Sequence, residues 1–271
     1  MSESRRVVAG ESFASLLMSR NQITGISADF LHEVFPASED ITRFRGSHSK
    51  LARHFEEPVV VTGSVATSWH LLGNGVRREK ERLNDIDVVV EGLSGLRPSL
   101  SEDFLIKHFH PHRGRGRILI QLVDEEHRMR IDVFTPTVNT LTTRLTDLAI
   151  GGISCRLVSA EDVAAKLLSV IYPATSGEPI EPKYVEHFRV LFTIVDLATA
   201  REIWRGYRKE SQTLEFEEAV DAVERSITAN PDLLRAGHYS QNINQTCQWC
   251  CESKLFPLAP LSKVYEVLGY V

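Results

Sequence analysis

The fold of this chain is decided by residues 58–92, which read PVVVTGSVATSWHLLGNGVRREKERLNDIDVVVEG. A β-branched run at residues 59–62 predicts a buried strand, and the Gly-Ser pair at residues 63–64 ends it. Helical spacing follows over residues 65–72, and a polar, basic connection then leads to a second apolar run at residues 86–90. This order of strand, helix and strand predicts the core of a mixed α/β unit.

Two carboxylates, Asp85 and Asp87, stand at the start of the second apolar run. Residues i and i+2 of a strand project from the same face, so these two carboxylates are predicted to lie together. Like charges that close repel each other and raise one pKa, and a cation between them would relieve the repulsion. Oxygen ligands on a rigid strand suit Mg²⁺, whereas an exposed strand end that happens to carry the DxD pattern is the alternative.

A third carboxylate comes from a predicted hairpin. Residues 117–123 and 129–134 are apolar, β-rich runs separated by a polar turn. Asp132 lies in the second run, where an unpaired charge would be costly. A metal shared with Asp85 and Asp87 would provide the partner for this carboxylate.

The Gly-Ser pair before a helix, the DxD pair on a strand and the lone Asp on a later strand resemble the nucleotidyltransferase superfamily, with its DNA polymerase β-like palm. The resemblance implies that Asp85, Asp87 and Asp132 bind two divalent metals, Mg²⁺ or Mn²⁺. It also implies that Gly63 and Ser64 hold the triphosphate of an NTP. A glycine allows close backbone approach at that point, and the free N–H groups of a helix start favour a phosphate.

The resemblance covers roughly residues 57–135 and departs from the family in one respect. The gap from Gly63 to Asp85 is longer than in many members, and its extra length is basic. The basic residues are Arg77, Arg78, Lys80 and Arg82. Either this segment forms a loop beside the triphosphate, with Arg82 as a nucleotide contact, or the motif is misaligned.

A later stretch, residues 157–172, has the spacing of a helix, and Ser159 with Asp162 forms a capping pair at its start. It resembles the helix that follows the palm in abortive-infection AbiEii-type toxin nucleotidyltransferases. The matching residues are Glu161, Asp162, Ala165, Lys166 and Leu167. The resemblance implies that Lys166 contacts the nucleotide, and a lysine that extends its ammonium to solvent is the alternative.

That group carries a second patch after a loop, commonly Lys-Asp and a further Asp. Here Lys183 matches, but Tyr184 stands where Asp is expected, and His187 stands near the second position. The departure leaves the catalytic base of that subgroup unassigned in this chain.

Composition limits the class of protein. The 271 residues are 42% hydrophobic and 25% charged, which is usual for a soluble globular chain of one or two domains. The net charge of -5 gives no global basic field, so a nucleic-acid site would have to be a local patch. We find no apolar stretch as long as a secretion signal or a membrane span, which predicts a cytoplasmic protein with no membrane partner.

We predict an α+β fold, in which a mixed nucleotidyltransferase palm sheet flanked by helices precedes a mainly α-helical domain. The predicted limits are residues 1–55 for an N-terminal helical region, 56–158 for the palm and 159–271 for the helical domain. Helices are predicted at residues 11–18, 27–35, 38–55 with an interruption at Gly46, 184–210 with an interruption around Gly206, and 214–229.

Histidines and cysteines offer a competing metal chemistry. Three histidines alternate along the chain: His108, His110 and His112. On a strand they would share one face and could bind a metal, but the proline within this run favours an edge strand or a loop. A cysteine group could bind zinc, but its spacing is not that of a standard finger, and buried structural cysteines are the competing interpretation. The group consists of Cys247, Cys250 and Cys251, with His238 upstream.

Three functions follow from these patterns. The first is a metal-dependent enzyme that moves an NMP from an NTP to an acceptor hydroxyl and releases pyrophosphate. Its acceptor could be RNA such as a tRNA end, a protein or a small molecule, and a toxin of this kind would have a cognate antitoxin as partner. The second is a palm that binds a nucleotide or a partner without chemistry. The third is an interaction protein stabilised by zinc.

Overall fold

The computed structural model describes most of the chain, namely residues 34–35, 37–56, 58–76, 82–93, 96–110, 118–136, 144–150, 152–208, 212–237 and 256–270. Several predicted features lie outside the described residues: the helix at 11–18, most of that at 27–35, the basic residues 77–80, His112 and the cysteine group at 247–251.

Among the described residues, seven strands form one mixed sheet in the order β3-β4-β5-β2-β1-β7-β6. The strands are β1 (Val60–Thr62), β2 (Asp85–Val89), β3 (Leu105–Phe109), β4 (Ile118–Asp124), β5 (Met129–Phe134), β6 (Thr146–Ile150) and β7 (Ile153–Leu157). The β1–β7 and β2–β5 pairs are parallel, and the other neighbours are antiparallel. The predicted α+β class and the predicted hairpin are confirmed, whereas β6 and β7 were not predicted.

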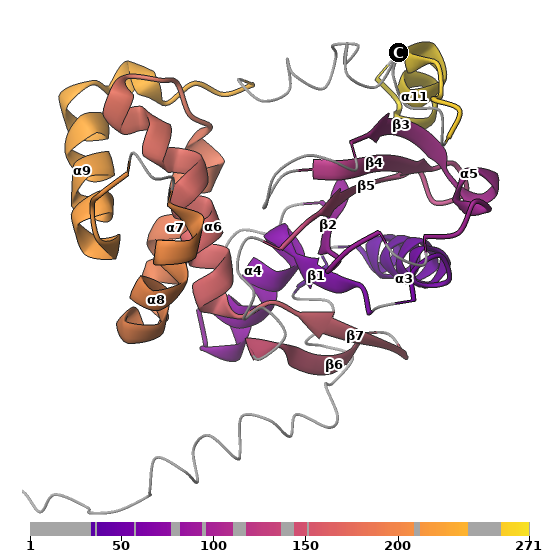
Figure 1. Cartoon of the computed structure of the whole chain (residues 1–271), viewed down its shortest axis with the longest axis horizontal. Coiled ribbons are helices and arrows are strands. Elements are labelled where there is room, and N and C mark those ends of the chain that lie inside the picture. Colours follow the sequence, from indigo (N-terminus) through magenta and orange to yellow (C-terminus); the bar gives the residue numbers. More distant parts are fainter. Residues whose placement is uncertain are drawn as a thin grey trace, which may run out of the picture.

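Helices flank this sheet and form a separate layer beside it (Figure 1). They are α3 (Ser38–Ala52), α4 (Gly63–Gly73), α5 (Leu100–Asp103), α6 (Ala160–Ile171), η2 (Tyr172–Ser176), α7 (Pro182–Phe192), α8 (Leu197–Tyr207), α9 (Phe216–Ala229), η3 (Pro231–Leu233) and α11 (Leu261–Leu268). None of the described helices is long and apolar enough to cross a membrane. Helix α11 falls within the range predicted for the helical domain, yet it contacts β3 and β4.

The pleat of β2 and β5 separates an apolar face from a charged face. The inward side chains on these strands are fully buried at 0% exposure: Ile86, Val88, Ile131 and Val133. The carboxylates alternate with them and therefore lie on the opposite face. Burial of the apolar face fixes the register, because a shift by one residue would exchange the two faces.

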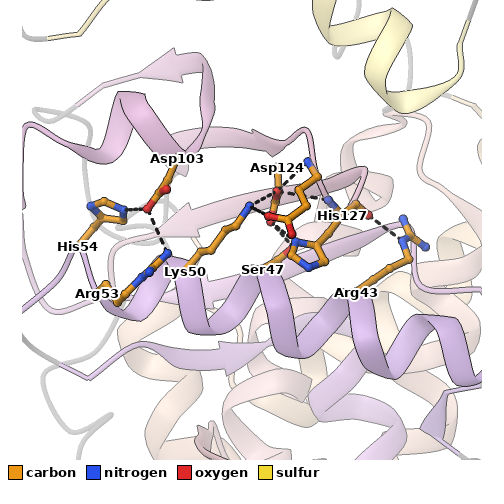
Figure 2. A network of polar contacts seen from close by, with 9 residues as sticks. Arg43, Ser47, Lys50, Arg53, His54, Asp103, Asp124 and His127 are labelled. Carbon is orange, nitrogen blue, oxygen red and sulfur yellow. Dashed lines mark hydrogen bonds and ion pairs between the residues drawn. The ribbon is translucent and has the colours of Figure 1, made fainter.

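Helix α3 is tied to the β4–β5 turn by the buried carboxylate of Asp124 (Figure 2). Ser47 Oγ donates to Asp124 Oδ2 at 2.8 Å, and Lys50 Nζ donates to Oδ1 at 2.9 Å. His127 Nδ1 lies 2.8 Å from Asp124 Oδ2. Burial alone would raise the pKa of Asp124, but the hydrogen bonds from Lys50, His127 and Ser47 hold it below its usual value.

The predicted interruption of α3 at Gly46 is wrong, because the helix runs unbroken from Ser38 to Ala52. A Cβ built on Gly46 would lie 2.0 Å from His127 Nε2. The glycine therefore makes room for the ring that Asp124 holds against the helix. Tertiary packing accounts for this residue, which helix propensity alone would interpret as a break.

We expect Gly46→Ala to destabilise the protein, although alanine is the better helix former. The His127 ring must move, and overpacking of this kind costs about 1–3 kcal/mol of unfolding free energy. Urea unfolding measures the change. Gly73→Ala is the matched control, since a Cβ at this α4 position meets nothing within 4 Å. Equal effects of the two changes would contradict the packing argument.

Helices α6, α7, α8 and α9 pack together on the side of α4 away from α3 (Figure 1). The Ser159 cap is confirmed, since its Oγ accepts from the Asp162 backbone N–H at 3.1 Å. The predicted interruption around Gly206 agrees with the end of α8 at Tyr207, where the next residue, Arg208, is extended. A second break, between the end of α7 at Phe192 and the start of α8, was not predicted; there the Asp196 carboxylate caps α8 by accepting from Thr199 N at 2.9 Å.

Candidate functional site

Parallel pairing of β2 and β5 brings the predicted carboxylates together. Asp87 lies directly opposite Asp132, and Asp85 lies opposite Arg130. Opposed residues of neighbouring strands project from one face, so all three carboxylates share it. Asp85 and Asp87 are partly exposed, while Asp132 is 6% exposed.

The Gly-Ser turn lies against this carboxylate group. Thr62, the last residue of β1, pairs with Asp87, and α4 begins at Gly63. Gly63 has φ +66°, and a Cβ on it would lie 2.0 Å from Asp87 Oδ2. The side chain of Thr62, the N-cap residue of α4, makes no capping hydrogen bond, so it does not occupy the first N–H groups of the helix.

Arg130 links two of the carboxylates. Its Nη2 is ion-paired with Asp85 Oδ2, and its Nε lies 3.6 Å from Asp132 Oδ2. Burial works against the charge of this guanidinium, but Asp132, Asp85 and Asp87 outweigh it and raise its pKa. From β4, Gln121 Nε2 donates to Asp132 Oδ1 at 2.7 Å. The glutamine hydrogen bond therefore orients Asp132, and Arg130 adds an ion-pair contact.

Burial and mutual repulsion raise the pKa values of two carboxylates of this site. Burial, and then the neighbouring charge of Asp85, raise the pKa of Asp87 to about 7. Burial also raises the pKa of Asp132, in spite of Arg130, the Gln121 hydrogen bond and Lys107. Protein cations alone thus leave part of the negative charge of this site uncompensated.

Lys166 enters the site from α6. Its Nζ lies 3.6 Å from the centre of the Phe134 ring, and Phe134 follows Asp132 by two residues on the same face of β5. Burial lowers the pKa of Lys166, while the charges of Asp87, Asp132 and Asp85 act in the opposite direction. The structure therefore brings Lys166 together with all three carboxylates.

Arg82 is placed elsewhere. Its Nη2 lies 3.4 Å from Glu39 Oε1 on α3, and its side chain is 63% exposed. The structure does not bring this side chain to the carboxylates, and its role as a nucleotide contact stays a prediction.

Sequence reasoning missed Arg130, Gln121 and Phe134. A signal for Arg130 and Phe134 was present, because both stand two residues from Asp132 and so share its strand face. Gln121 could be found only from the register of the hairpin, in which it pairs with Asp132. Neither the Arg130–Asp85 contact nor the Lys166–Phe134 contact is local in the chain.

A second group of possible metal ligands, Asp124, Glu126 and His127, lies at the β4–β5 turn. Lys50 Nζ already contacts it, at 2.9 Å from Asp124 Oδ1 and 2.6 Å from Glu126 Oε2. An ammonium thus occupies the position that a metal would need, and we interpret this group as a structural ion-pair network (Figure 2).

The alternating histidines are partly described. His108 lies on β3, which is at the edge of the described sheet, and its ring centre is 4.1 Å from that of His110. His108 pairs with Gln121, so the two residues share the carboxylate face. Zinc binding at the cysteine group stays a prediction, because those residues lie outside the described part.

Comparisons with known proteins gave distant similarities. No protein-family model and no curated protein matches the chain. Among solved structures, the chain is similar to an antigenic nucleotidyltransferase-like protein from Paracoccidioides brasiliensis, with 16% identity and a TM-score of 0.41 over 80% of this chain and 98% of that one. It is also similar to the antibiotic-resistance factor ANT(2'')-Ia, with 14% identity and a TM-score of 0.42 over 70% of this chain and 97% of that one. Similarities this distant assign no function, which has to be argued from the site.

Proposed function

We propose that this protein is a metal-dependent nucleotidyltransferase that moves an NMP from an NTP to an acceptor hydroxyl and releases pyrophosphate. The observation that carries the proposal is the parallel register that sets Asp87 opposite Asp132, with Asp85 on the same face and Gly63 against the Asp87 carboxylate. Carboxylates beside an open helix start suit a metal–triphosphate complex.

The residues present fit a divalent cation. The donors are oxygen atoms of Asp85, Asp87 and Asp132, the ligand type that Mg²⁺ or Mn²⁺ prefers. Burial and the charge of Asp85 raise the pKa of Asp87 to about 7, and a bound cation would relieve both effects. Bound Mg²⁺ would neutralise the triphosphate and the leaving pyrophosphate and would lower the pKa of the acceptor hydroxyl.

The protein residues would position the reactants. The first N–H groups of α4 and the Ser64 hydroxyl would donate to phosphate oxygens, and Lys166 would offset their charge. Gln121 would hold Asp132 in one orientation through its hydrogen bond, and Arg130 would remain its ion-pair partner. In the reaction, the acceptor oxygen bonds to the α-phosphorus, the bond from this phosphorus to the bridging oxygen breaks, and pyrophosphate and the hydroxyl proton leave.

A toxin role in the AbiEii manner is a finer form of this proposal. Its support is the position of Lys166, which the matching helix α6 brings to the carboxylates. A cognate antitoxin would then be a partner, and co-expression with the neighbouring gene would test for it.

The proposal is tested by incubating the full chain with each α-labelled NTP, Mg²⁺ or Mn²⁺, and total RNA or a cell lysate. We expect label to enter one class of acceptor, with pyrophosphate release that EDTA stops. If no NTP labels any acceptor while Mg-NTP still binds, the chain is a nucleotide-binding palm without chemistry.

A separate prediction concerns Lys166. Lys166→Met keeps the length of the side chain and removes the charge, so we expect a near-unchanged melting temperature without ligand and a clear loss of the thermal shift given by Mg-NTP. Lys263→Met is the comparison and should keep the full shift, since this partly exposed ammonium pairs with Glu125 in the β4–β5 turn at 3.2 Å. A full ligand-induced shift in Lys166→Met would remove Lys166 from the nucleotide site.

A further inference from the structure

The ammonium of Lys166 lies against an aromatic ring and not against a carboxylate. Its Nζ is 3.6 Å from the centre of the Phe134 ring, which is a cation–π contact. Two carboxylates of the site keep other partners, since Asp85 pairs with Arg130 and Asp132 accepts from Gln121. Within the described part of the chain, Lys166 Nζ makes no ion pair with an acidic side chain. The ring is therefore the group that holds this charge in the nucleotide-free protein.

The Phe134 ring has a fixed base in the sheet. Phe134 ends β5 and follows Asp132 by two residues, so it projects from the carboxylate face roughly 7 Å further along the strand. Its backbone pairs with Val89 of β2 and with Ile118 of β4. Its carbonyl oxygen accepts from Val90 N at 3.0 Å. Strands on both sides therefore hold the residue that carries the ring.

The lysine side chain also starts from a fixed point. Asp162 lies one turn before Lys166 on α6 and is 2% exposed. Its carboxylate accepts from Arg144 Nε at 3.1 Å and from Arg144 Nη2 at 3.0 Å. Ser159 Oγ donates to the same carboxylate at 2.8 Å. These contacts hold the first turn of α6, so the base of the lysine stem and the ring are both fixed before a ligand binds.

A ring and a carboxylate would hold this ammonium with different consequences. A carboxylate would neutralise the charge and would use an oxygen atom that a metal needs. A ring face attracts the ammonium through its quadrupole, and the N–H donors turned away from the ring stay available for phosphate oxygens. A side chain that is already held in place also loses less conformational freedom when the ligand binds. The ring therefore keeps the charge in place without occupying it.

We propose that Phe134 is a positioning residue whose ring holds the Lys166 ammonium on one side, so that the other side of the ammonium meets the triphosphate. This assignment rests on the proposed function and deepens it, because it says how the site keeps its lysine in place before the nucleotide binds. The ring contact persists in the bound state, since ring and phosphate take different sides of the ammonium. Phe134 acts through Lys166 and makes no contact with the nucleoside.

The test changes the electrostatics of the ring and keeps its shape. Phe134 is replaced in the full chain by phenylalanine analogues with one, two and three ring fluorines, which withdraw electron density from the ring face. Titration calorimetry measures the dissociation constants of Mg-ATP, Mg-GTP, Mg-CTP, Mg-UTP and Mg-tripolyphosphate, the last of which carries phosphates alone. For every probe that binds the wild type, we expect affinity to fall stepwise with fluorination, to a loss of about fivefold at three fluorines.

Further variants separate positioning from packing. Phe134→Leu should also weaken binding about fivefold, whereas Phe134→Tyr keeps the ring face and should bind like the wild type. In the Lys166→Met background, read at higher probe concentration, neither Phe134→Leu nor the fluorines should change the affinity further. Phe192→Leu is the matched control and should leave the affinity unchanged, because this partly buried ring at the end of α7 lies 5.8 Å from Phe188 and 6.0 Å from Phe216.

Unchanged affinity across the fluorinated series would overturn the positioning role, and so would an equal loss from Phe134→Leu with and without Lys166. A loss seen with the nucleotides but not with Mg-tripolyphosphate, where this probe binds, would also overturn it, because the ring would then contact the nucleoside. Each of these results leaves the nucleotidyltransferase proposal standing. If the wild type binds none of the probes, the result counts against the proposed function, and the positioning role falls with it.

Discussion

Asp87→Asn is expected to abolish nucleotide transfer while the metal-free protein becomes as stable as the wild type or more stable. The side chain lies opposite Asp132 and against Gly63, so an amide there removes a metal ligand at the centre of the site. Loss of one carboxylate also removes repulsion from Asp85, which contributes with burial to the raised pKa of Asp87. Turnover with a saturating Mg-NTP measures the first effect, and urea unfolding in EDTA measures the second.

The destabilising effect of the Asp87 charge should also appear in the pH dependence of the unfolding free energy. In the folded state the pKa of Asp87 is about 7, and in the unfolded chain it returns to about 3.9. Between these values the folded protein binds more protons than the unfolded chain, so the wild type should lose stability as pH rises from about 4 to about 7 and then level off. Asp87→Asn should lack this contribution. Lys166 and Arg130 face the same group; burial lowers the pKa of Lys166, whereas the carboxylates raise the pKa of Arg130.

Asp147→Asn is the matched control for this prediction. Asp147 lies on β6, pairs with Arg156 at 2.9 Å and is 75% exposed. Its substitution should change neither turnover nor the pH profile. Near-normal turnover in Asp87→Asn would show that β2 does not carry the reacting site.

Predictions from the sequence succeeded where the signal is local. Alternation along β2 and β5 placed Asp85, Asp87 and Asp132 on the face opposite Ile86 and Ile131, because burial of an apolar face fixes the orientation of every second side chain. The Ser159 cap could be predicted for the same reason, since donor and acceptor are three residues apart.

Predictions failed where a residue far away in the sequence determines the local structure or contact. Helix propensity alone predicts a break at Gly46, but the helix continues, and the glycine is explained by the His127 ring of the β4–β5 turn, which packs against it. The break between α7 and α8 was missed for the same reason, because the start of α8 is held from outside by Glu161, whose Oε1 accepts from the Asp196 backbone N–H at 3.1 Å. The Arg130–Asp85 pair depends on a parallel register between strands that are separated by a hairpin, and no local pattern specifies it.

The conformation of Gly63 leads to the last prediction, that Gly63→Ala lowers both stability and transfer. Two physical effects act at this residue. Its φ of +66° is unfavourable for any residue with a Cβ, at a cost of about 1–2 kcal/mol. The new Cβ would also lie 2.0 Å from Asp87 Oδ2 and 2.8 Å from Asp87 Cβ, and overpacking of this kind costs about 1–3 kcal/mol more.

Gly75→Ala separates the two effects. Gly75 has φ +73°, close to that of Gly63, but a Cβ on it meets nothing within 4 Å. Its substitution should therefore show the backbone cost alone, with transfer unchanged, and the difference between the two variants in urea unfolding measures the clash with Asp87. Gly63→Ala must displace the Asp87 carboxylate, so its transfer rate should fall even where most of the protein is folded. Equal unfolding free energies and equal transfer rates for the two variants would mean that Gly63 is not in close contact with Asp87. The proposed triphosphate site between α4 and β2 would then lose its geometric basis.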